Sequence, residues 1–139
     1  MTREATVRDW GARIDRLNNP GRLGLLPPDD IWAFHGRQRV RFMMDLGAGT
    51  GLFSLPLARF LPPDGLLLAV DPSRVLAGFM NTRVRPEEPR ILPLAAWGHA
   101  LPVADGFLDL VVMINLYHEL SEPSATLREV RRTLRPGGS

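Results

Sequence analysis

Residues 43–62 read MMDLGAGTGLFSLPLARFLP, and this stretch decides the fold. An apolar run ends at Asp45, and the glycines Gly47, Gly49 and Gly51 then follow at every second position. Sequence with helical character begins directly after them. An apolar strand that passes through a glycine-rich turn into a helix is typical of an α/β fold. Glycine has no Cβ, so such a turn also allows positive φ and a close approach of backbone to a ligand.

The same alternation of strand and helix continues on both sides of this stretch. The predicted strands are residues 40–46, 66–70, 90–94 and 108–115, and the predicted helices are residues 2–17, 29–35, 51–60, 73–83 and 123–134. This order predicts a Rossmann-like, doubly wound parallel sheet with helices on both faces and right-handed crossovers. Pro93 indicates that the third strand is not central, because proline cannot donate to a sheet ladder.

The last predicted helix carries two further expectations. Leu127, Val130 and Leu134 recur at helical spacing and predict its buried stripe. A group of four arginines is expected to form a solvated face: Arg128, Arg131, Arg132 and Arg135. Residues 23–28, near the start of the chain, are expected to be irregular.

Composition narrows the class of protein. The chain has 139 residues, of which 45% are hydrophobic and 23% charged, as expected for one globular domain. All 17 basic residues are arginines and they are scattered, so no nucleic-acid surface is indicated. Cysteine is absent, and His35, His99 and His118 are isolated, so no metal site is predicted. No apolar run approaches the roughly 20 residues of a membrane span, and no secretory signal is visible, so we expect a cytoplasmic protein without a membrane partner.

The glycine spacing distinguishes between ligands. The dinucleotide fingerprint is G-x-G-x-x-G, whereas this loop reads G-x-G-x-G and places Leu52 where the third dinucleotide glycine would stand. Asp45 stands two residues before the first glycine, where a carboxylate is awkward for a pyrophosphate and suits an ammonium or sulfonium group. A pairing of Asp45 with an arginine is the alternative.

A second acidic residue ends the next predicted strand. Asp71 can accept hydrogen bonds from both hydroxyls of a ribose, because a carboxylate offers two acceptor oxygens. The alternative is that Asp71 caps the helix that follows Pro72.

Five segments together resemble the class I S-adenosylmethionine-dependent methyltransferases of the ubiquinone/menaquinone and arsenite types. The segments are DLGAGTG (45–51), AVDPS (69–73), ALPVADGFLDLVV (100–112), LYHEL (116–120) and LREVRRTLRPGG (127–138). They occur in the family's order, and the resemblance covers about residues 22–138. It implies strand order 3-2-1-4, an N-terminal helical lid over residues 1–36 and a partial cofactor-binding domain over residues 37–139, with the family's strands 5–7 missing.

The resemblance also implies S-adenosyl-L-methionine as cofactor and a role for each of several residues. The loop Gly47–Gly51, with Ala48 inside it, would lie against the methionine part, and Asp45 would face the ammonium group. Asp71 would hold the ribose hydroxyls. The remaining implied contacts are Pro72 beside the adenine, Asn115 in the methionine pocket and Trp10 on the lid.

Two features depart from the family pattern. Trp97 occupies a position that is often acidic in the family and that meets the adenine amino group. It either stacks on adenine or packs within the protein, and packing is the preferred interpretation. Backbone N–H groups near Gly98 can bind adenine instead. The family's order would also leave the fourth strand as an exposed apolar edge, which a homo-oligomer or another partner would cover.

Three functions follow. The first is methyl transfer to a small-molecule acceptor by in-line displacement, and no catalytic residue is assigned for it. His118 and Tyr117 follow the fourth strand, where a catalytic base can lie, but a structural hydrogen bond is the preferred role for them. The second is a truncated, non-catalytic cofactor-binding module that needs a partner. The third, an NAD-dependent oxidoreductase, is disfavoured by the glycine spacing.

Overall fold

Four parallel strands form the centre of the molecule. The computed structural model describes residues 3–35, 39–85 and 90–139. The strands are β1 (Phe42–Leu46), β2 (Leu66–Asp71), β3 (Arg90–Ala95) and β4 (Leu110–Val112), in the order β3-β2-β1-β4. The predicted order is confirmed, and β3, which contains Pro93, lies at one end of the sheet as expected.

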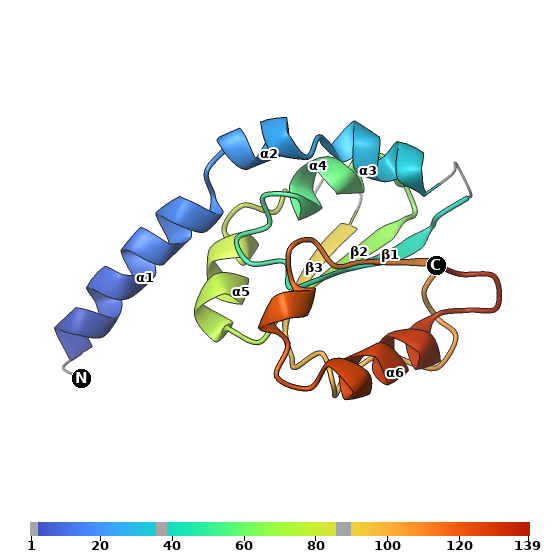
Figure 1. The fold of residues 1–139 in the computed structure, drawn as a ribbon. Coiled ribbons are helices and arrows are strands. Elements are labelled where there is room, and N and C mark those ends of the chain that lie inside the picture. The colour runs from blue at the N-terminus through green and yellow to red at the C-terminus, as the bar shows by residue number, and fades with distance from the viewer. Residues whose placement is uncertain (1–2, 36–38, 86–89) are drawn as a thin grey trace.

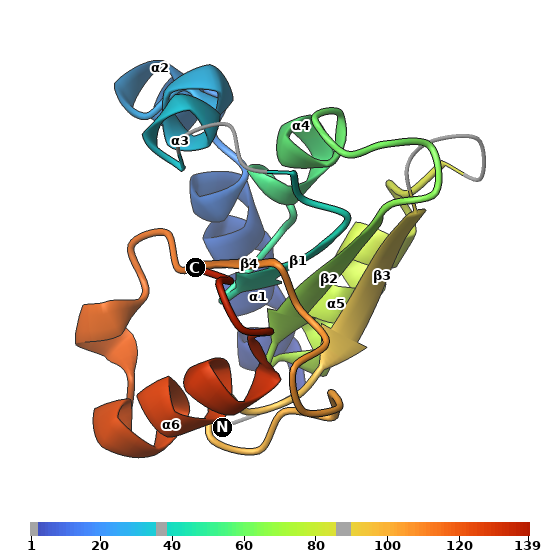
Figure 2. The same cartoon turned by 90° about the vertical axis from the view of Figure 1, so that its right-hand side faces the viewer.

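Six α-helices and one 3-10 turn surround the sheet. They are α1 (Arg3–Leu17), α2 (Gly21–Leu25), α3 (Pro28–Phe34), α4 (Ser54–Ala58), α5 (Arg74–Asn81), η1 (Tyr117–Glu119) and α6 (Pro123–Thr133). Figure 1 shows α2, α3 and α4 on one side of the sheet and α6 on the other, while α1 extends away from the body. The view turned by 90° in Figure 2 shows the same two layers of helices with the sheet between them.

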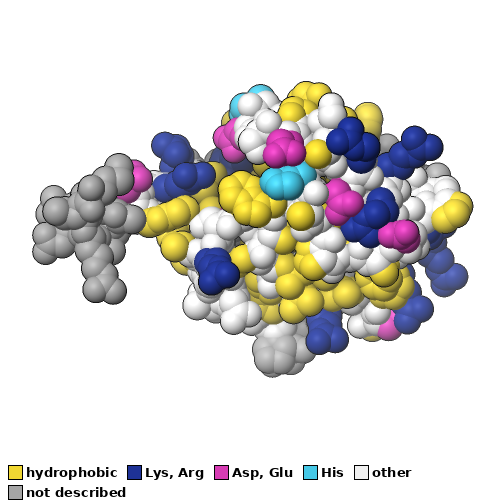
Figure 3. Space-filling model, turned by 90° about the horizontal axis from the view of Figure 1, so that it is seen from below, with side chains coloured by type: hydrophobic (Ala, Val, Ile, Leu, Met, Phe, Trp, Pro, Cys, Tyr) yellow, Lys and Arg dark blue, Asp and Glu magenta, His cyan; other side chains and the backbone are white. Residues whose placement is uncertain are grey.

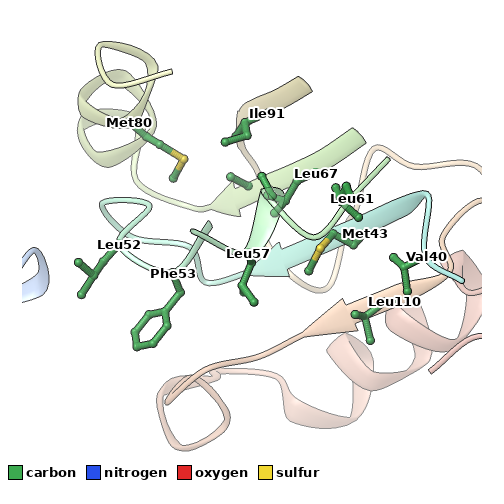
Figure 4. Close-up of a cluster of buried hydrophobic side chains, with 12 residues drawn as sticks. Val40, Met43, Leu52, Phe53, Leu57, Leu61, Leu67, Met80, Ile91 and Leu110 are labelled. Carbon is green, nitrogen blue, oxygen red and sulfur yellow. The ribbon is translucent and has the colours of Figure 1, made fainter. Parts of the chain in front are cut away.

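The buried side chains of β1 explain why helices cover both faces. Met43 and Met44 are neighbours in the strand, both are 0% exposed, and each belongs to a different hydrophobic cluster. Adjacent residues of a strand point to opposite faces, so β1 must be covered on each side. Figure 4 shows the Met43 cluster, in which Leu57 of α4 and Met80 of α5 pack over the sheet.

Several element boundaries differ from the predictions. Residues 23–28 are not wholly irregular, because α2 spans Gly21–Leu25. The helix predicted from residue 51 begins only at Ser54, since Gly51 has a φ of 80° and cannot lie in a right-handed helix. The fourth strand is shorter than predicted and ends at Val112; further along, Asn115 has a φ of 53°, which is incompatible with extended backbone.

The predicted stripe of α6 is partly wrong. Leu127 is 42% exposed, whereas Thr126 and Thr133 are the buried residues of the helix. The reason lies in the opposing surface: a Cβ built on Gly98 would lie 2.9 Å from Thr126 Cγ2, so the glycine lets the loop approach α6 closely enough to bury a threonine. Val130 and Leu134 do pack against the core.

The arginines of this region do not all belong to a solvated face. Arg128 and Arg131 are exposed, but Arg132 donates to Glu129, to Asp105 and to the carbonyls of Leu101 and Val103. The hydrogen bond from Arg132 lowers the pKa of Glu129 to about 2. Figure 3 shows the arginines on the face seen from below as dispersed side chains rather than one basic patch.

The outer edge of β4 already carries the beginning of another strand pairing. Leu108 and Leu134 form a parallel bridge. Beyond this bridge, the Ser139 N–H donates to the Asp109 carbonyl (3.1 Å) and the Val111 N–H donates to the Ser139 carbonyl (2.9 Å). That pair of bonds is the parallel-ladder pattern and sets Ser139 beside Leu110.

Candidate cofactor site

The glycine loop leaves the carboxyl end of β1, which is where open α/β sheets bind ligands. Gly47, Gly49 and Gly51 all have positive φ, at 79°, 58° and 80°. Side chains crowd the first and the last of them. A Cβ on Gly47 would lie 2.6 Å from Leu116 Cδ1, and one on Gly51 would lie 2.8 Å from Met80 Cγ.

Gly49 is the glycine with open space beside it. A Cβ built there would meet only Leu17 Cδ1, at 3.9 Å. Gly51, by contrast, packs on α5 and is not among the residues that line the two pockets described below. The structure therefore separates the three predicted glycine contacts: Gly47 and Gly49 reach the pockets, and Gly51 shapes the loop from behind.

Most N–H groups of the loop are already satisfied within the protein. Gly47 and Ala48 donate to the Val70 carbonyl at 2.7 and 3.0 Å, Gly51 donates to the Ala48 carbonyl at 2.9 Å, and Gly49 donates to Asp71 Oδ2 at 3.1 Å. A phosphate nest needs such N–H groups to point at the ligand. The loop is consequently a poor site for a pyrophosphate, in agreement with its glycine spacing.

Asp45 is buried under the loop with 2% of its surface exposed. Its Oδ2 accepts a hydrogen bond from the Ser54 hydroxyl at 2.6 Å, and among the described residues no arginine pairs with it. The predicted alternative of an arginine partner is therefore wrong. Burial raises the pKa of Asp45 to about 6; the Ser54 bond opposes this rise and the negative charge of Asp71 adds to it.

Asp71 joins the end of β2 to two other segments. Its Oδ1 accepts the Ser73 N–H at 2.9 Å, at the start of α5, and its Oδ2 accepts the Gly49 N–H. Each carboxylate oxygen has a second lone pair, so both oxygens can still accept from a ligand. Burial raises the pKa of Asp71, while its two N–H donors act in the opposite direction. Ser73 itself caps α5 by accepting from the Leu76 N–H.

Two adjoining pockets bring the predicted residues together. The first, here the loop pocket, has a volume of about 180 Å³ and is lined in part by Asp45, Gly47, Ala48, Gly49, Asp71 and Asn115. The second, here the Trp97 pocket, has a volume of about 120 Å³ and includes Gly47, Asp71, Pro72, Trp97 and Gly98. Nine of the ten predicted contact residues line one pocket or both, and Gly51 is the exception.

The two pockets meet at Gly47, Asp71, Leu116 and Glu119. Trp97 is 58% exposed, so the preferred interpretation that it packs within the protein is wrong. Its ring lies beside His99 with centroids 5.9 Å apart, and both residues line the Trp97 pocket. An exposed indole next to a pocket can stack on a flat ligand.

The N-terminal segment contributes less of a lid than expected. Leu17, at the end of α1, and Arg22 of α2 line the loop pocket, but Trp10 lines neither pocket and has Arg13 above its ring at 5.1 Å. His118 lies at the loop pocket on η1, whereas Tyr117 lies beside it at 57% exposure without lining that pocket.

Sequence reasoning missed three residues of the site. Ser54 holds Asp45, Arg22 places a guanidinium at the loop pocket, and Thr50 carries a buried Oγ1 that has no hydrogen-bond partner among the described residues. A polar residue between two glycines was the available signal for Thr50. Neither a set of three metal-binding side chains nor a helix long and apolar enough to span a bilayer occurs in the described ranges.

Comparison with known proteins agrees with this geometry. A family model described as "Methyltransferase domain" matches residues 43–138, which is more than half of the chain. The chain belongs to this methyltransferase family. The predicted resemblance is thereby confirmed, and with it S-adenosyl-L-methionine as the cofactor of the family.

Three relatives illustrate the similarity. The ubiquinone/menaquinone biosynthesis C-methyltransferase of Geobacter sulfurreducens is 30% identical over 94% of this chain and 52% of its own length. An uncharacterized methyltransferase of Mycobacterium avium is 34% identical over 79% of this chain and 42% of its own. The crystal structure of a SAM-dependent methyltransferase from Aquifex aeolicus superposes with a TM-score of 0.82 at 25% identity, over 90% of this chain and 67% of that one. The chain thus spans about half the length of these two curated relatives.

Proposed function

We propose that this chain binds S-adenosyl-L-methionine across the loop pocket and the Trp97 pocket and that the site serves methyl transfer to a small-molecule acceptor. The observation that carries the proposal is the pair of carboxylates, Asp45 and Asp71, on either side of a loop whose N–H groups are already used. A glycine loop with few free N–H donors and a carboxylate on each of two adjoining strands favours a cation with a sugar diol over a phosphate.

In this proposal, different parts of the cofactor occupy the two pockets. Asp45 lies below the loop pocket and suits the ammonium group of the methionine part, and Asp71, shared by both pockets, suits the ribose hydroxyls. Pro72, Trp97 and Gly98 surround the space left for adenine.

The bound cofactor supplies an electrophilic methyl group and a neutral thioether leaving group. The chain's contribution would be to hold this cofactor at Asp45 and Asp71 and to align a small-molecule acceptor with its methyl group for in-line transfer. A base is required only for an acceptor that arrives protonated, and His118 at the loop pocket is the nearest candidate.

Calorimetric titration tests the binding step. We expect S-adenosylmethionine and S-adenosylhomocysteine to bind and NAD not to bind. The Asp71→Ala variant is expected to lose about 1–3 kcal/mol of binding free energy, because hydrogen bonds from the ribose to a charged acceptor disappear. Asp64→Ala is the matched control, since Asp64 is an exposed partner of Arg41 and lines neither pocket. Binding of NAD in place of the sulfonium compound would refute the proposal.

A second proposal concerns the edge of β4. We propose that a second copy of this chain covers this edge in the working protein. A groove of about 820 Å³ runs along it, lined by apolar residues that include Trp32, Phe34, Leu110 and Met113. Ser139 already occupies one rung of a parallel ladder there, and Phe34 is 95% exposed at the side of the groove. An open apolar strand edge of this kind recruits another strand or surface.

A further inference from the structure

The loop pocket contains one feature that the carboxylates do not explain, a guanidinium group. Arg22 of α2 is the one arginine among the described residues that line this pocket. Its Nη1 donates to the Leu17 carbonyl at 2.7 Å, and its Cζ lies 5.5 Å from the ring centroid of Phe53. Leu17 and Phe53 line the same pocket, so both contacts hold the guanidinium at the pocket wall.

Arg22 has donor capacity left over. A guanidinium carries five N–H donors, and the bond to Leu17 is the one hydrogen bond that the Arg22 guanidinium donates within the described part of the chain. The planar fork of a guanidinium matches the geometry of a carboxylate and can bind it with two parallel hydrogen bonds.

The charges around the pocket are arranged for a ligand with two opposite charges. Asp45, Asp71 and Glu119 supply negative charge, and Arg22 supplies a positive one. An amino-acid group carries both an ammonium and a carboxylate. The N–H groups of Gly47, Ala48, Gly49 and Gly51 are engaged within the protein and are not available for that carboxylate, which leaves Arg22 as its charged partner.

An unused hydroxyl in the same pocket supports this assignment. Thr50 is 1% exposed, lines the loop pocket, and its Oγ1 has no hydrogen-bond partner within the described residues. A buried polar group without a partner is costly, so such a group in a binding pocket indicates a ligand atom that satisfies it. A carboxylate bound at Arg22 is an acceptor of the kind that this hydroxyl lacks.

We infer that Arg22 is a specificity-determining residue that binds the α-carboxylate of the cofactor's amino-acid end and so selects intact S-adenosylmethionine over its decarboxylated form. The inference rests on the proposed cofactor site and adds to it the recognition of one chemical group. Asp45 and Asp71 recognise parts that both compounds share, whereas Arg22 recognises the part in which they differ.

The test compares two ligands on the same protein. Isothermal titration of the wild-type chain with S-adenosylmethionine and with decarboxylated S-adenosylmethionine is expected to show a preference of about 10- to 100-fold for the former, the range for a hydrogen-bonded charge pair. In Arg22→Gln the preference should fall to near unity, mainly through weaker binding of S-adenosylmethionine. Arg22→Lys should retain part of the preference, since charge remains and the fork is lost.

The ratio of the two affinities separates recognition from structural damage. Structural damage from losing the contacts to Leu17 and Phe53 would weaken the binding of both ligands equally and leave the ratio of their affinities unchanged. Arg128→Gln, an exposed arginine of α6, is the matched control and should keep the wild-type ratio. Equal affinity of the wild-type chain for the two ligands, or an unchanged ratio in Arg22→Gln, overturns the inference and leaves the cofactor site standing. Binding of neither ligand overturns both.

Discussion

The surroundings of Asp45 disfavour the charged form of its carboxylate. The carboxylate is buried, one hydroxyl donates to it, and its pKa is about 6, compared with an ordinary value near 3.8. Between these two values the folded chain binds a proton that the unfolded chain has released. The free energy of unfolding therefore decreases as the pH rises from about 4 to 6 and is level above that range, for a cost of about 3 kcal/mol.

The Asp45→Asn variant should remove this cost. Its free energy of unfolding at pH 7, measured in urea, is expected to exceed that of the wild-type chain, and the decrease between pH 4 and 6 should shrink. Cofactor affinity should move in the opposite direction: wild-type binding tightens by about tenfold from pH 5 to 7 as Asp45 ionises, and the variant shows no such change. A wild-type affinity that does not vary over this range would contradict an ammonium contact with Asp45.

The glycines of the loop allow a second comparison. In Gly51→Ala the new Cβ would lie within 3 Å of Met80 Cγ, in addition to the strain of a φ of 80°, whereas Gly49→Ala meets nothing closer than 3.9 Å. We expect Gly51→Ala to lose about 2–4 kcal/mol of stability and Gly49→Ala about 1–2 kcal/mol.

The two variants should rank in the opposite order when the loss of ligand affinity is compared instead of the loss of stability. Urea denaturation measures the stability of both variants, and titration with S-adenosylhomocysteine measures their affinity at a temperature where both are folded. Gly49→Ala should lose more affinity than Gly51→Ala, since Gly49 faces the loop pocket and Gly51 does not. Equal losses of stability in the two variants would show that the Met80 side chain can move away from the new Cβ without a loss of free energy of unfolding.

Among the secondary-structure elements, those with strong local signals were predicted and those set by distant contacts were not. The alternation of strands and helices and the positions of the carboxylates Asp45 and Asp71 follow from short stretches of sequence, whereas the order of the strands was implied by the family resemblance. The partner of Asp45 was missed because Ser54 reaches it only after the loop has turned back. The buried face of α6 was missed because Gly98, 28 residues before Thr126, decides which side of the helix is approached.

One carboxylate organises several elements at the other end of the sheet. Asp109 is buried, with 9% of its surface exposed. Its Oδ2 accepts the N–H groups of Arg41 and Phe42 at 2.8 Å each, where β1 begins, and its Oδ1 pairs with Arg135. Burial alone would raise the pKa of Asp109, and these donors together lower it below its ordinary value. No local signal in the sequence pointed to the pairing of Asp109 with Arg135.

The molecule as a whole presents two hollowed surfaces, the loop and Trp97 pockets at the carboxyl ends of the strands and the apolar groove beside β4. They meet at Ile114 and Asn115, which line both the loop pocket and the groove. A second copy of the chain on the groove, as proposed, would therefore lie next to the proposed methionine end of the cofactor site and could help to shape the space for the methyl acceptor.

Phe34→Glu tests the groove as an interaction surface. Phe34 is 95% exposed, so the change should leave the midpoint of thermal unfolding unaltered while placing a charge at the groove. Sedimentation velocity over a range of concentrations is expected to show self-association of the wild-type chain and less of it in the variant. Leu127→Glu, on the exposed side of α6, is the control. A monomeric wild-type chain at every concentration would mean that copies of this chain do not cover the edge.

The exposure of Trp97 also gives the protein an optical probe of its own. Of the three tryptophans, this one lies at the Trp97 pocket, whereas Trp10 lies on the projecting helix and Trp32 stacks on Phe60 at 5.1 Å. A purine that stacks on the indole would quench its emission and leave the signal of the other two rings as a constant background. Occupancy of the adenine half of the site can thus be followed by fluorescence, with no label attached and no turnover required.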